Sequence, residues 1–254
     1  MKELLRRFAA WCGFFRCPLC KEKGGNGRNE LCPECLSLLE LLPAEGRCRG
    51  CGGRNDSALA VCSGCMAFPA RPYSDALAVM EYSGAAQTLI REMKFRGHPE
   101  LARPLAYLAV EQLRKSGMEF DVIVPVPLHW QRFLKRTYNQ TELLASLIGS
   151  EMGKPVIRGL KKVRATPHQS RLKKSKRQKF LKNCFAVRDR SFECKKVLLI
   201  DDVLTTGATV TTAAKVLLKN GAESVKVLCS ARTPLKIKLV PQKKAYREKT
   251  PDMP

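Results

Sequence analysis

Residues 197–209 read VLLIDDVLTTGAT, and this stretch decides the expected fold class. Val197–Ile200 is a short apolar run with β-branched residues at both ends, which predicts a buried strand of a parallel sheet. Asp201 and Asp202 follow directly, at the sheet edge where open α/β folds bind their ligands. Carboxylates at that edge can accept hydrogen bonds from sugar hydroxyls.

The acids lead through Val203 and Leu204 into a turn of five small residues: Thr205, Thr206, Gly207, Ala208 and Thr209. Amides in such a turn can approach an anion closely, Gly207 tolerates a positive φ, and the next helix directs its positive end at the anion. The pattern predicts a ribose 5-phosphate, with its hydroxyls on Asp201 and Asp202 and its phosphate on the turn. The alternative interpretation is a plain strand followed by a helix start that Asp and Thr cap.

The whole stretch resembles the motif that binds 5-phosphoribosyl 1-pyrophosphate (PRPP) in type I phosphoribosyltransferases. That motif consists of a hydrophobic strand, two acidic residues and a Thr/Gly phosphate loop. The resemblance implies an α/β fold of that type, with a parallel sheet covered by helices on both faces. It also implies PRPP with magnesium as the ligand.

Eight of the twelve cysteines form four Cys-x-x-Cys pairs in the first quarter of the chain: Cys17/Cys20, Cys32/Cys35, Cys48/Cys51 and Cys62/Cys65. Two such pairs supply four thiolates to one tetrahedral zinc, so four pairs predict two zinc sites. Sequential pairing is the simplest arrangement, and crossed pairing stays open. Because four thiolates leave no open position for water, both sites are expected to be structural. Redox or disulfide chemistry is the alternative.

The composition is that of a globular protein of 254 residues with a formal net charge of +23. Such a charge favours a polyanionic partner such as nucleic acid, or strongly anionic ligands, with a membrane surface as the weaker alternative. No apolar run approaches the roughly 20 residues of a membrane span, and a secretory pattern is missing, so a cytoplasmic location is expected.

The chain divides into three expected parts: a zinc-binding module over 1–70, an α/β domain over 71–235 and a basic tail over 236–254. Apolar residues at helical spacing predict helices around 86–93 and 101–113, and again over 138–152 and from the phosphate turn to Lys219. Strands are expected at 121–126 and 224–230, with a further short one at 156–160. Alternating strands and helices predict a parallel sheet.

A basic stretch runs from Arg158 to Lys182, with eleven Lys or Arg residues and no acid. It could close over the pyrophosphate of PRPP or bind a DNA or RNA backbone, and a solvated loop without a ligand is the third possibility. The nucleic-acid candidates within it are Lys173, Lys174, Lys176 and Arg177.

A second candidate surface interleaves aromatic and cationic residues: Trp130, Arg132, Phe133, Lys135, Arg136 and Tyr138. Aromatic side chains in such a setting can stack unpaired bases. A helix start packed on the core explains the same aromatics equally well.

The order of these features resembles the ComF family of competence proteins, in which cysteine pairs precede a phosphoribosyltransferase-like domain. VPVPL at 124–128 matches the proline-rich strand end of the family. Further matches are Lys94, Phe95 and Gly97, then Arg136 with Asn139 and Gln140, then Thr166, Gln169, Leu172, Arg177 and Phe185. The resemblance implies a role in natural transformation with single-stranded DNA, with a protein of the competence machinery as a possible partner.

Two functions are therefore expected as alternatives. One is a nucleic-acid-binding factor in which the phosphoribosyl site serves as a ligand sensor or as a phosphate-binding site. The other is an active, magnesium-dependent phosphoribosyltransferase on an unidentified base or amine. Candidates for the pyrophosphate or flexible loop are Val126, Pro127, Arg136, Gln169 and Arg171, and no residue stands out as a general base.

Overall fold

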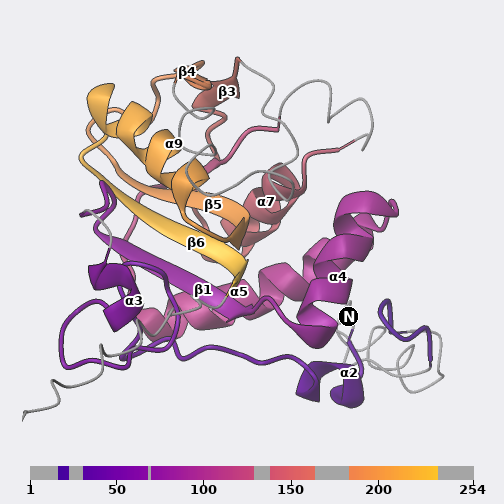
Figure 1. Ribbon diagram of the computed structural model, residues 1–254. Coiled ribbons are helices and arrows are strands. Elements are labelled where there is room, and N and C mark those ends of the chain that lie inside the picture. Colours follow the sequence, from indigo (N-terminus) through magenta and orange to yellow (C-terminus); the bar gives the residue numbers. More distant parts are fainter. Residues whose placement is uncertain (1–16, 23–30, 68–69, 129–137, 164–182, 234–254) are drawn as a thin grey trace, which may run out of the picture.

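A four-stranded parallel sheet forms the centre of the molecule (Figure 1). The computed structural model describes residues 17–22, 31–67, 70–128, 138–163 and 183–233. The strands lie in the order β1-β6-β5-β2, and each neighbouring pair is parallel. Their bounds are Asp75–Glu81 (β1), Val122–Pro125 (β2), Lys196–Leu204 (β5) and Ser224–Arg232 (β6).

Helices cover both faces of this sheet, which confirms the predicted α/β class. Residues of β5 alternate between the two faces: Leu198 and Ile200 pack with one set of helices, and Val197 and Leu199 with the other. The first set comprises α4 (Gly84–Phe95), α5 (Ala102–Ser116) and α7 (Gln140–Met152), with the short 3₁₀ helix η1 (Pro99–Leu101) between α4 and α5. The opposite face carries α9 (Ala208–Lys219).

Two features away from the end of β5 differ from the sequence expectations. The strand β1 is completely apolar over residues 76–80 and had no prediction. The strand expected at 156–160 is instead a single bridge between Val156 and Ile123, followed by β3 (Leu160–Lys162). This strand pairs with β4 (Phe185–Val187) in an antiparallel ribbon that lies beside α9.

The cysteine-rich segment packs along the free edge of β1. Its backbone pairs with the strand through three hydrogen bonds: the amide of Leu42 donates to Val79 O (2.9 Å), that of Glu81 to Glu40 O (2.9 Å) and that of Ala78 to Gly52 O (3.4 Å). Arg47 adds an ion pair to Asp75 (2.6 Å) and donates to Ala76 O. Because an open strand edge is a template for unwanted pairing, this segment protects the sheet.

Two short helices lie within that segment, α2 (Pro33–Ser37) and α3 (Ser63–Met66), both placed below β1 in Figure 1. Each begins directly after a cysteine, at Cys32 and Cys62. Buried cysteines from the segment share the two hydrophobic cores of the sheet. The segment is therefore built onto the α/β domain through the core as well as through the edge of β1.

Candidate functional site

The site opens where β2 ends while β5 continues. Pro125 of β2 pairs with Ile200, and beyond that point β5 runs on to Leu204 with only β6 beside it among the described residues. Asp201 and Asp202 therefore lie inside β5, whereas the sequence predicted that the strand would stop at Ile200. The early end of β2 exposes both acids to a crevice at the carboxyl edge of the sheet, the usual ligand site of open α/β folds.

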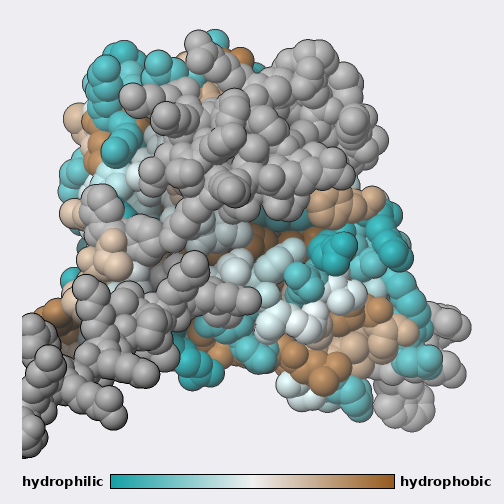
Figure 2. Space-filling model, viewed as in Figure 1, coloured by the Kyte–Doolittle hydropathy of each residue, from teal (hydrophilic) through white to brown (hydrophobic). Residues whose placement is uncertain are grey.

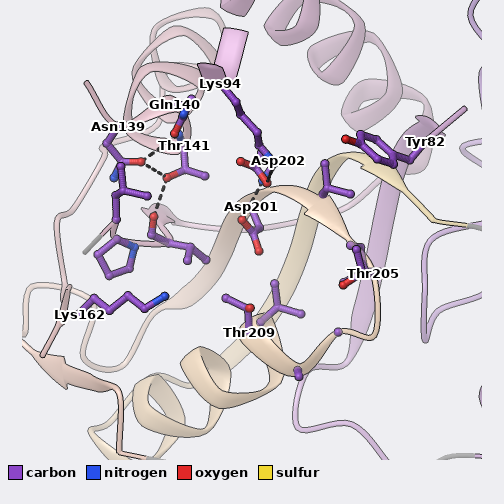
Figure 3. Close-up of a pocket in the computed structure, with 18 residues that line it drawn as sticks. Tyr82, Lys94, Asn139, Gln140, Thr141, Lys162, Asp201, Asp202, Thr205 and Thr209 are labelled. Atoms are coloured by element: carbon purple, nitrogen blue, oxygen red, sulfur yellow. Dashed lines mark hydrogen bonds and ion pairs between the residues drawn. The ribbon is translucent and has the colours of Figure 1, made fainter. Parts of the chain in front are cut away.

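This crevice contains a cavity of about 310 Å³ (Figure 3). The predicted stretch Asp201–Thr209 lines it throughout, except for Thr206, which faces a neighbouring cavity of about 760 Å³ beside α9. Figure 2 shows hydrophilic residues over α9 and over the carboxyl end of α4 on this face. The remaining lining residues are Tyr82, Lys94, Val126, Pro127, Leu128, Asn139, Gln140, Thr141, Lys162 and Val210.

The two acids point to opposite faces of the sheet because neighbouring residues of a strand alternate. Asp202 meets α4, where its Oδ1 lies 2.8 Å from Nζ of Lys94. Both side chains are only about one-sixth exposed, at 16% and 15%. One carboxylate of the site is thus held in a nearly buried ion pair.

Asp201 points toward α9 and has no such ion pair among the described residues. Its Oδ1 accepts the backbone amide of Asp202 at 2.9 Å. Burial raises the pKa of Asp201 to about 7, and the negative charge of Asp202 adds to this effect. Near neutral pH this carboxyl can therefore either accept or donate a hydrogen bond.

We expect Asp201→Asn to stabilise the ligand-free protein. Because the native pKa of Asp201 lies above its unfolded value of about 3.9, the native state binds the proton more tightly. Ionisation of Asp201 therefore opposes folding. The free energy of unfolding falls as pH rises from about 4 to about 7, and the full loss of stability is reached above pH 7. At about pH 8 the asparagine variant should be about 1 to 3 kcal/mol more stable than wild type, and near pH 4 about equal to it.

The matched control is Asp202→Asn, which leaves the Lys94 ammonium without this partner. It should lose about 1.5 to 3 kcal/mol, since hydrogen bonds to charged groups contribute that much. Urea denaturation at both pH values measures the two effects. If both variants shifted stability in the same direction at about pH 8, the different environments assigned to the two acids would be wrong.

Within the turn Thr205–Thr209, Gly207 has a φ of +75°, in the left-handed region that favours glycine. Gly207 is the N-cap of α9 and makes no side-chain cap, and the first amides of a helix have no partner within it. The first residues of α9, Ala208 to Val210, line the cavity. The amide of Ala208 donates to Oγ1 of Thr206 at 3.4 Å. The positive end of the helix dipole at this point suits a phosphate group.

The opposite wall comes from the residues after β2 and the start of α7. Asn139 caps α7 because its Oδ1 accepts from the backbone amide of Thr141 (3.3 Å), and the hydroxyl of Thr141 donates its single proton to Val126 O (2.6 Å). These bonds fix the chain that carries Val126 and Pro127 against the helix start. Gln140 is 1% exposed, and its buried Nε2 finds no acceptor within the described part of the chain. A buried amide donor at a cavity wall is satisfied when a ligand supplies an acceptor.

Most nucleic-acid and flexible-loop candidates lie outside the described residues, namely Trp130, Arg132, Phe133, Lys135, Arg136, Thr166, Gln169, Arg171, Leu172, Lys173, Lys174, Lys176 and Arg177. Tyr138 is described, and its hydroxyl donates to Met93 O on α4. This contact is the one expected if the aromatic packs at a helix start.

The eight paired cysteines form two groups, Cys17, Cys20, Cys32 and Cys35 in the first and Cys48, Cys51, Cys62 and Cys65 in the second. Sulfurs of a group lie within 4.8 Å of one another, with examples at 3.7 Å (Cys20–Cys32) and 3.9 Å (Cys51–Cys62). Four sulfurs around one zinc at about 2.3 Å lie about 3.8 Å apart. The structure therefore groups the pairs sequentially, in a geometry compatible with two zinc sites.

Sequence reasoning missed three parts of the site. Lys94 was noted only as part of a motif, and its pairing with Asp202 depends on how α4 packs on the sheet. Lys162 extends into the cavity from β3, and Tyr82 lies near the end of β1 at the other side (Figure 3). Lys162 was hidden in a long basic run, and Tyr82 follows a strand that had no prediction.

Comparison with known proteins places this site in a recognised domain. A family model described as the phosphoribosyl transferase domain matches residues 141–252, a range that includes β5, the phosphate turn and α9. Among solved structures, glutamine PRPP amidotransferase from B. subtilis aligns with a TM-score of 0.39 and 20% identity, over 55% of this chain and 30% of that chain. Among the described residues, no helix is both long and apolar enough to cross a membrane.

Several relatives match most of the chain. Competence protein F of Haemophilus influenzae is 31% identical over 227 residues, covering 86% of this chain and 97% of that protein. DNA utilization protein YhgH of Salmonella typhimurium is 32% identical over 212 residues, covering 81% and 86%. The resemblance drawn from the sequence motifs is thereby confirmed, and the chain belongs to the competence protein F (ComF) family, with a phosphoribosyl transferase domain.

Proposed function

We propose that the protein binds PRPP, or a related ribose 5-phosphate, with magnesium in the cavity at the end of β5. The observation that carries the proposal is the combination of two carboxylates and a left-handed glycine turn around one cavity. The ribose hydroxyls lie on Asp201 and Asp202, and the 5-phosphate lies on the amides from Thr205 to Thr209. The pyrophosphate lies toward Val126, Pro127 and the unpaired amide of Gln140.

Isothermal titration of the full-length, zinc-loaded protein with PRPP and Mg²⁺ tests this assignment. Asp201→Asn with Asp202→Asn should weaken binding at least tenfold, because each carboxylate that accepts a hydroxyl proton contributes about 1.5 to 3 kcal/mol. The control is Glu111→Gln on α5, since this partly exposed acid does not line the cavity. Unchanged affinity in the double variant would refute the ribose assignment.

We propose further that the protein acts with single-stranded DNA during DNA uptake. Two of its relatives carry the names competence protein and DNA utilization protein, and the net charge of +23 favours a polyanionic partner. The basic stretch with Lys173, Lys174, Lys176 and Arg177 is the surface proposed for the DNA backbone, and Trp130, Arg132, Lys135 and Tyr138 are proposed to contact bases or phosphates.

Binding to an oligonucleotide over a range of salt concentrations measures this contact. Each lost phosphate contact lowers the slope of log K against log salt by about 0.7 for single strands, so neutralising the four basic residues should lower it by up to about 2.8. An unchanged affinity and slope would show that this basic stretch is not the DNA surface.

The second candidate function is catalysis, a magnesium-dependent phosphoribosyl transfer to a base or amine. Tyr82 favours it, because an aromatic side chain at the end of the cavity opposite Lys162 could stack an acceptor ring. Release of pyrophosphate on addition of candidate acceptors distinguishes this function, since binding alone releases none.

A further inference from the structure

Arg71 joins the second cysteine group to the phosphate turn. Its Nη2 lies 3.8 Å from Sγ of Cys65. Its Nη1 donates to the hydroxyl of Tyr73, which in turn donates to Gly50 O at 2.9 Å. Gly50 stands between Cys48 and Cys51, so two parts of the cysteine group hold the guanidinium.

The same guanidinium packs directly on Gly207. A Cβ built on Gly207 would collide with Nη1 of Arg71, so the arginine fills the space that any larger residue would need. Gly207 is the left-handed N-cap from which α9 starts. Arg71 therefore supports the turn at the point where its backbone is most unusual.

A second arginine makes a similar connection just before the turn. Arg232 is 6% exposed and pairs in register with Leu204, the last residue of β5. The absence of a side chain at Gly53 leaves room for its guanidinium, which would collide with a Cβ there. Gly53 follows Cys51 closely in the chain, so a second arginine links the cysteine-rich segment to β6 beside Leu204, just before the turn.

The chemistry of the group explains why arginines lie here. Four thiolates with one Zn²⁺ carry a net charge of −2, and a buried charge needs nearby opposite charge. All four cysteines are buried, and Arg71 comes within 4 Å of one of them. The donor set therefore fits zinc, and the cation beside it is also the support of the phosphate turn.

We propose that Arg71 is a positioning residue through which the metal-bound second cysteine group holds the phosphate turn in its binding conformation. The identity of the ligand rests on the function proposed above, but the order of the turn can be measured without any ligand. By reciprocity, a ligand on the turn raises the zinc affinity of this cysteine group by the same factor by which zinc raises the affinity of the ligand.

Hydrogen–deuterium exchange of the full-length, zinc-loaded protein tests the proposal. Without ligand, Arg71→Ala should speed amide exchange of the 203–210 peptide at least tenfold. Arg71→Lys keeps the charge but has one terminal nitrogen in place of Nη1 and Nη2, so it should also speed exchange of this peptide. The matched control is Arg49→Ala, an exposed arginine between Cys48 and Cys51, and it should leave this peptide unchanged. Unchanged exchange in both Arg71 variants would overturn the proposal.

The coupling between the turn and the second cysteine group can also be tested by a substitution in the turn. Gly207→Ala places a methyl group against Arg71 and should speed zinc release from the second cysteine group at least threefold. Gly153→Ala is the control, because it has a similar φ of +63° with nothing within 4 Å of a Cβ. Equal zinc release in both glycine variants would also overturn the proposal.

These measurements separate the two proposals. If wild type fails to bind PRPP while Arg71→Ala speeds exchange of the turn, the proposed ligand is wrong and the positioning role stands. If wild type binds PRPP and both Arg71 variants bind it equally, with unchanged exchange, the positioning role is wrong and the proposed ligand stands.

Discussion

A chelator added to the zinc-loaded protein should release two zinc ions per chain in two kinetic phases. The fast phase is expected from Cys17, Cys20, Cys32 and Cys35, because Cys20 is exposed. The slow phase is expected from the second group, whose four cysteines are all buried against the sheet. A metallochromic dye follows both phases.

Loss of the second zinc should have the larger structural effect. Structural zinc contributes about 10 to 16 kcal/mol in zinc-finger peptides, which is similar to the whole stability of a typical domain, about 5 to 15 kcal/mol. Its removal should free the edge of β1, and fast amide exchange at residues 75–81 should accompany the slow phase. Cys20→Ser should remove only the fast phase, and Cys194→Ser, at an exposed cysteine outside both groups, should change neither. A single phase, or one zinc per chain, would contradict the assignment of two sites.

Gly52→Ala should destabilise the protein by about 2 to 5 kcal/mol, combining the cost of a left-handed alanine with overpacking. Gly52 has a φ of +70°, and a Cβ there would collide with the amide nitrogen of Ala78 and lie 2.7 Å from the carbonyl carbon of Leu77. Both atoms belong to the backbone of β1, which cannot move without disturbing the sheet. The cysteine segment would have to lift away from the strand edge.

Gly46→Ala is the matched control for this substitution. Its φ of +61° imposes the same kind of backbone strain, but nothing lies within 4 Å of a Cβ. We expect a loss of only about 1 to 2 kcal/mol. Denaturant unfolding at a fixed zinc concentration compares the two variants, and equal losses would show that contact with β1 contributes nothing.

The Thr/Gly turn after β5 was predictable because its signal is local. A strand, two acids and a Thr/Gly turn follow one another within thirteen residues, and each element requires its own residue type. The helix expected to end at Lys219 does end there, before Asn220 and Gly221. The cysteine pairs are local in the same way, since a spacing of two residues directs both sulfurs at one ion.

Other elements could not be predicted because their signals are ambiguous or distant. The apolar run of β1 has neither a ligand motif nor polar alternation, and a short run of this kind does not distinguish a buried strand from a helix. The strand end expected at Ile200 is wrong because β6 continues beside β5 after β2 has stopped. Pairing with that neighbour keeps Asp201 and Asp202 in extended backbone.

The sequence by itself determined the class of fold, the residues around the phosphate turn and the cysteines that can hold zinc, since each depends on neighbours along the chain. Only the tertiary structure decided that Lys94 meets Asp202, that the burial of Asp201 raises its pKa, and that Arg71 lies between Cys65 and Gly207. These contacts join residues far apart in sequence, and packing of the helices and the cysteine segment on the sheet creates them.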